Sequence, residues 1–158
     1  MEFYLAQINI AKMLAPIDSP VMAGFVAGLD PVNALAENSE GFVWRLKDDS
    51  NNATAIKIFD DDFLITNMSV WTTTDALFQF VYRSNHVESF KRRKEWFEHM
   101  PEMSTALWYI PVGHLPTVDE AVEKLTYLRN NGETPLSFSF KKRFTSEDAR
   151  TYALKHSG

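Results

Sequence analysis

A single-domain α+β fold is predicted for this chain by three features of its sequence. Along the chain, segments in which apolar residues recur every second position, as in strands, alternate with segments in which they recur at helical spacing. The length of 158 residues suits one domain with a substantial core. Hydrophobic residues make up 45% of the chain and charged residues 23%, which excludes a largely disordered protein. We expect one domain over residues 1–144, followed by a tail over residues 145–158.

The first strand and the first helix are predicted near the N-terminus. Residues 3–10 alternate between two faces, one of which is fully apolar. Ser19 followed by Pro20 is typical of a helix start, because serine caps a helix and proline fits its first position. Apolar residues then recur at helical spacing as far as Ala36. Pro31 lies within this pattern and lacks an N–H group, so we expect a kink or a second helix start there.

Two strands and a second helix follow. Residues 42–47 predict a strand with Trp44 inward and Arg45 outward. Residues 63–71 predict the next strand, with alternate residues on opposite faces. A helix is then expected from Thr72, because the acidic residue three positions later completes a capping box. We expect an interruption near 83–86 and then a further helical piece that carries Trp96 and ends at Pro101.

The last third of the chain predicts a strand, a helix and two short elements. Residues 105–112 alternate as a strand does, and Thr117 begins a capping box for an amphipathic helix that Gly132 ends. A short strand over 136–140 and a short helix after Ser146 complete the chain.

The element order β-α-β-β-α-β, with an extra helix and a short strand, is the split βαβ or ferredoxin-like order. Helices on one face of an antiparallel sheet leave its other face apolar and bare. Two such sheets packed face to face would cover each other, so we expect a homodimer that forms a dimeric α/β barrel.

Composition excludes several classes of protein. The chain has no cysteine, which rules out disulfides, thiolate metal sites and a cysteine nucleophile. The first ten residues lack the basic start and the apolar run of a signal peptide, and no stretch is long enough to span a membrane. We therefore expect a cytoplasmic protein without a membrane partner. The net charge of −5 argues against nucleic acid as a partner.

Aromatic residues make up 13% of the chain, which is more than one small core readily hides. Trp44, Trp71 and Trp108 come from three different predicted strands. If they face one space, they form a pocket for a flat apolar or aromatic ligand. The alternative is packing at the dimer interface.

Several polar residues are candidates for the site. His86, at the expected helix interruption, could act as a general base or bind haem iron, although a histidine that caps the interruption is the more common case. Four polar residues on otherwise buried strands could bond a ligand or each other: Gln7, Asn9, Asn67 and Ser69. His114 lies in a turn and could reach a pocket mouth, or lie on the surface. Metal signals are weak, and we expect no metal site.

Five segments of the sequence resemble an uncharacterised family, a domain of unknown function within the dimeric α/β-barrel superfamily. These segments are residues 5–11, 41–46, 67–71, 82–86 and 108–114 together with 116–117. The resemblance implies a ferredoxin-like fold related to that of the antibiotic-biosynthesis monooxygenases, which oxidise aromatic polyketides without metal or flavin. The superfamily also contains haem-degrading monooxygenases that use an asparagine on the first strand and a histidine near the helix after the third. Asn9 and His86 have comparable placements here.

We therefore hypothesise a small-molecule-binding protein that acts as a cofactor-independent, monooxygenase-like enzyme on an aromatic or flat apolar compound. In it, His86 is the base, Asn9 orients the substrate and the tryptophans form the walls. One alternative is a haem-binding or haem-degrading protein with His86 as the axial ligand. The other is a non-catalytic dimeric domain whose pocket is closed by packed side chains.

Overall fold

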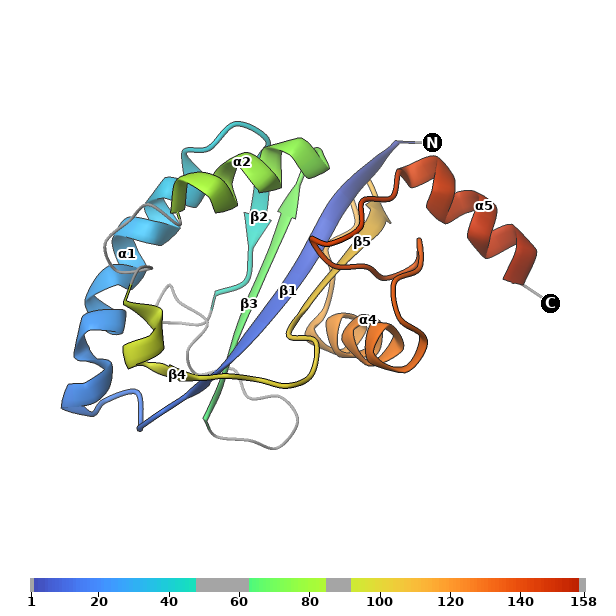
Figure 1. The fold of residues 1–158 in the computed structure, drawn as a ribbon. Helices are drawn as coiled ribbons and strands as arrows, with labels where there is room; N and C mark the ends of the chain where they lie inside the picture. Colours follow the sequence, from blue (N-terminus) through green and yellow to red (C-terminus); the bar gives the residue numbers. More distant parts are fainter. Residues whose placement is uncertain (1, 48–62, 85–91, 157–158) are drawn as a thin grey trace.

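The computed structural model describes residues 2–47, 63–84 and 92–156 (Figure 1). The two longest strands are β1 and β3, and helices α1, α2 and α4 lie against the sheet. The described elements are β1 (Phe3–Met13), α1 (Ala23–Glu37), β2 (Phe42–Arg45), β3 (Leu64–Trp71), α2 (Thr74–Ser84), β4 (Phe97–Glu98), β5 (Thr105–Pro111), α4 (Val118–Asn131) and α5 (Ser146–His156), with short 3-10 turns at Pro20–Met22 and Arg93–Glu95. No helix in the described part of the chain combines the length and the hydropathy that a membrane crossing requires.

The sheet is antiparallel and has β1 at its centre. Strand β3 pairs with one edge of β1, and β2 lies outside β3. Strand β5 pairs with residues 3–9 on the other edge of β1, and the two-residue strand β4 pairs with Lys12 and Met13 beyond it. With α1 between β1 and β2 and α2 after β3, this is the ferredoxin-like arrangement. The predicted fold class is confirmed.

Helices cover both faces of this sheet. Figure 1 shows α1 and α2 on one side and α4 on the other. Under α4, Leu125 and Leu128 pack against a fully buried cluster that includes Ile8, Val70 and Trp108. The expectation that one sheet face is bare is therefore wrong, because the helix after β5 crosses to the face that α1 and α2 leave open. The homodimer inferred from that bare face stays a prediction.

A β-bulge in β2 changes which of its side chains point to which face. Phe42 pairs with Trp71, whereas Trp44, two residues later, pairs with Val70, the immediate neighbour of Trp71. One extra residue of β2 therefore lies between Phe42 and Trp44, and Arg45 then pairs with Ser69. An extra residue reverses the alternation beyond it. The prediction that Arg45 points outward is wrong. Its side chain lies on the face of the sheet that α1 and α2 cover, and only 8% of it is exposed.

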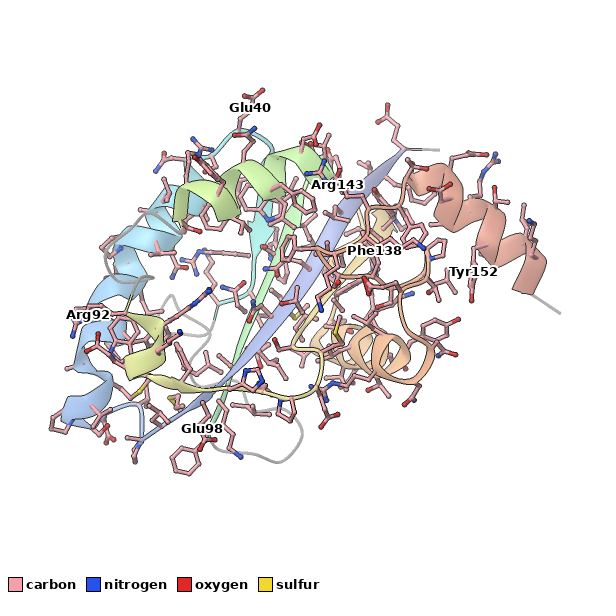
Figure 2. All side chains as sticks on the ribbon, in the orientation of Figure 1. Glu40, Arg92, Glu98, Phe138, Arg143 and Tyr152 are labelled. Carbon is pink, nitrogen blue, oxygen red and sulfur yellow. The ribbon has the colours of Figure 1, made fainter. Side chains whose placement is uncertain are left out.

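Four other predicted details differ from the structure. Helix α1 continues through Pro31 without a second start. The hydroxyl that caps α2 belongs to Thr73, one residue later than predicted, and accepts a hydrogen bond from the N–H of Ala76. The helical piece expected up to Pro101 is replaced, in its described part, by the turn and strand at residues 93–98. The strand expected at 136–140 is reduced to two isolated bridges, one between Thr134 and Ser137 and one between Leu107 and Phe138, and Figure 2 labels Phe138.

One buried polar contact fixes α4 on the sheet, and we expect its loss to be measurable. The indole N–H of Trp108 donates to Oε2 of Glu120 over 2.9 Å, and Trp108 is only 1% exposed. Glu120→Ala leaves this buried donor unpaired, which should lower the free energy of unfolding by about 1–3 kcal/mol in urea denaturation.

His114 provides the control for this prediction. Its Nε2 lies 2.7 Å from Oε1 of the same Glu120, but 45% of the His114 side chain is exposed. An exposed ion pair contributes at most about 1 kcal/mol. A His114→Ala change as costly as Glu120→Ala would show that the indole contact is not the stabilising one.

Candidate functional site

A cavity of about 520 Å³ lies between the sheet and the two helices α1 and α2. Its size falls within the range of roughly 300–1,000 Å³ that is common for small-molecule sites. On this face of the sheet, Leu5 belongs to one buried cluster and Met13 to another. Between them on β1 stand Gln7, Asn9 and Ala11, which line the cavity. Polar and small residues of β1 thus separate two apolar clusters, and the cavity lies between these clusters.

The floor of the cavity is a polar patch of the sheet. Asn9 pairs with Asn67 on β3 and with Thr105 on β5, so these three residues form one row across the central strands. All three line the cavity. In the next row, Gln7 lies beside Ser69. Hydrogen-bonding groups from three strands therefore face the same space.

A short network of hydrogen bonds fixes this floor. Nε2 of Gln7 donates to Oδ1 of Asn67 over 2.8 Å and to Oγ of Ser69 over 2.9 Å. The indole N–H of Trp71 donates to the same hydroxyl over 2.8 Å. Because Oδ1 of Asn67 accepts from Gln7, its amide N–H groups are the donors that remain for a molecule in the cavity.

The roof of the cavity is apolar and partly aromatic. It is formed by side chains from α1, from α2, from the turn before β4 and from β4 itself, namely Phe25, Leu29, Val32, Leu77, Phe80, Val81, Trp96 and Phe97. Trp96 is 2% exposed, and its ring centroid is 5.9 Å from that of Phe25. The prediction that Trp96 lies on a helix is wrong, because the residues before it form a 3-10 turn that ends at Glu95. Its role as a wall residue could not be read from the sequence.

Two arginines add positive charge to the wall. Arg45 enters from β2, and its Nε donates to Oε1 of Glu37 over 2.7 Å. Arg93 enters from the turn before β4. The described wall residues include no aspartate, glutamate or histidine. Sequence reasoning missed both arginines. The bulge turned Arg45 inward, and Arg93 lies in a run of basic residues, a pattern typical of a solvent-exposed face.

The shifted pKa values lie elsewhere in the described chain. Burial, followed by the charge of Asp148, raises the pKa of Tyr109, whose hydroxyl donates to the carbonyl of Phe144. Burial lowers the pKa of the Lys124 ammonium on α4. Neither residue lines the cavity. The described wall can thus orient and bind a ligand, but it offers no group suited to proton transfer near neutral pH.

The structure brings together some of the predicted site residues and separates others. Gln7, Asn9 and Asn67 line the cavity, and Ser69 lies directly behind them. The three tryptophans do not share one space. Trp71 packs behind Phe80 with ring centroids 5.1 Å apart, whereas Trp44 and Trp108 pack on the α4 face and His114 is on an exposed turn. His86 lies outside the described residues, and its predicted role stays a prediction.

The described wall residues offer no usual ligand for haem iron, and the haem alternative, which depends on His86 outside the described residues, stays a prediction. Haem iron is held in proteins by histidine, cysteine, methionine or tyrosine. The described wall has no histidine or tyrosine, and its one thioether, Met68, belongs to the buried cluster under α4. Nor do the described residues hold a group of three or more histidine, aspartate or glutamate side chains that could bind a metal ion.

Three comparisons relate this chain to known proteins. The profile of DUF3291, a domain of unknown function, matches residues 4–154. No curated protein matches the chain. Among solved structures, SnoaB, a cofactor-independent oxygenase from Streptomyces nogalater, is 17% identical, with a TM-score of 0.48 over 74% of this chain and 100% of SnoaB. PA3566 from Pseudomonas aeruginosa is 14% identical, with a TM-score of 0.37 over 73% of this chain and 98% of its own. Likenesses at this level say nothing about function.

Proposed function

The chain belongs to DUF3291, a family of unknown function, and from its cavity we propose that it binds a flat, largely apolar small molecule that carries hydrogen-bonding groups on one edge. The observation that carries this proposal is the division of the wall into a polar floor and an apolar roof. A ligand that lies between them buries its faces against the side chains of α1 and α2. Its polar edge reaches Asn9 and Asn67 on the sheet.

Physical chemistry favours such a ligand over a wholly apolar one. Apolar contact with the roof contributes about 25 cal/mol for each Å² removed from water. A wholly apolar ligand would cover the amide of Asn9 and the N–H groups of Asn67, whose Oδ1 is already bonded to Gln7, and each group left unpaired would cost about 1–3 kcal/mol. A polar edge avoids this cost. The cavity beside Asn9 also speaks against the alternative in which packed side chains close the pocket.

We propose that Asn9 orients the bound molecule, as predicted, because it stands in the middle of the polar row between Thr105 and Asn67. Asparagine has both a donor and an acceptor, so it can pair with a carbonyl or a hydroxyl on the ligand. A monooxygenase-like reaction on that molecule requires a base, and His86 keeps that predicted role. Binding is therefore the step that the cavity supports, and it can be measured without knowing the reaction.

The neutral fluorescent probe N-phenyl-1-naphthylamine tests this function. The probe is flat and apolar, has one N–H group and brightens when it leaves water. We expect saturable binding to the wild type at micromolar concentration. Val32, on α1, lines the cavity, and Val32→Phe should fill part of it and weaken the binding at least tenfold.

The matched control lies on the same helix. Val26 is 42% exposed and does not line the cavity, so Val26→Phe should leave probe binding unchanged. Thermal unfolding of both variants verifies that they are folded. Equal effects of the two substitutions, or no saturable binding by the wild type, would refute binding in this cavity.

A further inference from the structure

The charged residues that line the described part of the cavity are both basic. The whole chain is acidic, with 16 lysines and arginines against 21 aspartates and glutamates. The described wall reverses this balance, with Arg45 and Arg93 and no acidic residue. The excess of positive charge therefore does not follow from composition. Both guanidinium groups belong to residues that line one concave space.

Arg45 is placed there by two structural features. The bulge in β2 turns its side chain to the cavity side of the sheet, and only 8% of that side chain is exposed. Glu37, at the end of α1, holds the Nε group over 2.7 Å and is itself 45% exposed. A carboxylate that grips Nε fixes the plane of the guanidinium group, which is the group that suits paired contacts with oxyanions.

Arg93 approaches from a separate segment, the turn before β4. Its neighbour Arg92 is paired with Glu95 and lies over the ring of Trp96. The Arg93 side chain has no hydrogen bond or ion pair to another residue that the structure describes, and Arg93 lines the cavity. A cation from β2 and a cation from this turn thus face one space, and the described residues place no acidic group in its wall.

We infer that the ligand of this cavity is an anion, a flat apolar molecule that bears a carboxylate or a similar oxyanion, and that Arg45 and Arg93 select it. This inference rests on the proposed function and adds the charge of the ligand to it. The apolar body meets the roof, the amides of the floor bond the edge, and the oxyanion meets the guanidinium groups. Hydrogen bonds to charged partners are the strong ones in such a site, so charge should dominate selectivity.

Displacement of N-phenyl-1-naphthylamine tests the charge of the ligand. The two competitors are 2-naphthoate and 2-naphthamide at pH 7.5, which have the same rings and nearly the same size and differ in one negative charge. We expect naphthoate to displace the probe at a concentration about tenfold lower than naphthamide. Equal displacement, or weaker displacement by naphthoate, overturns the inference while probe binding still supports the proposed function. Absence of probe binding overturns both.

Variants identify the groups responsible. Arg93 is exposed, so Arg93→Gln should keep the fold and should reduce the preference for naphthoate at least threefold with little change for naphthamide. Lys94→Gln makes the same change of charge one residue away, outside the wall, and should leave the preference intact. Arg45→Lys keeps the charge but loses the planar fork, and should also lower the preference. An unchanged preference in both arginine variants, or an equal fall in Lys94→Gln, overturns the assignment.

Discussion

Replacing Gly41 with alanine is expected to lower the free energy of unfolding by about 2–5 kcal/mol. Gly41 links α1 to β2 with a φ of +84°, a conformation that costs an L-residue roughly 1–2 kcal/mol. An added Cβ would also lie 2.5 Å from Cβ of Ala76 and 2.7 Å from Oγ1 of Thr72. Overpacking of this kind costs about 1–3 kcal/mol more. Urea denaturation followed by circular dichroism measures the sum.

Two further variants separate the backbone cost from the clash. Gly113 has a φ of +97° and open space around it, so Gly113→Ala should show the backbone cost alone. Ala76→Gly removes the atom nearest to the new Cβ, so it should cost less in the Gly41→Ala background than in the wild type. If Gly41→Ala is no more destabilising than Gly113→Ala, the close approach of α2 to this turn is wrong.

Strand alternation was enough to predict the fold and the polar floor of the cavity. In β3, the alternation puts Asn67, Ser69 and Trp71 on one face, and their pairing with β1 confirms this. The same alternation in β1 puts Gln7 and Asn9 on one face. Side chains alternate strictly in a regular strand, so a polar residue within an apolar strand can be assigned to a face from the sequence.

The rest of the site depends on features that alternation does not record. One extra residue in β2 reversed the faces of Trp44 and Arg45, and no local signal marked the bulge. Alternation within one strand also does not determine which of its two faces lies on the same side of the sheet as a given face of the neighbouring strand. Trp108 pairs with Ala6 and Trp71 with Leu5, which are adjacent residues on opposite faces of β1. A shared tryptophan pocket was therefore impossible, but only the register shows it.

This separation of the tryptophans by the sheet gives the second large effect. Trp71→Ala and Trp108→Ala should each lower the free energy of unfolding by about 3–5 kcal/mol, because both rings are almost fully buried. Only Trp71 supports the cavity, since its ring stacks on Phe80 of the roof. Its indole N–H also bonds the Ser69 hydroxyl that Gln7 uses.

Binding of N-phenyl-1-naphthylamine, measured at a temperature where both variants are folded, should therefore fall at least fivefold in Trp71→Ala and stay near the wild-type value in Trp108→Ala. The two variants serve as controls for each other, because they lose similar stability on opposite faces of one sheet. If binding falls equally in both variants, the loss reflects a general loosening of the fold and does not place the ligand on the face that α1 and α2 cover. If it falls only in Trp108→Ala, the ligand lies under α4, and the assignment of the cavity to the face of Asn9 and Asn67 fails.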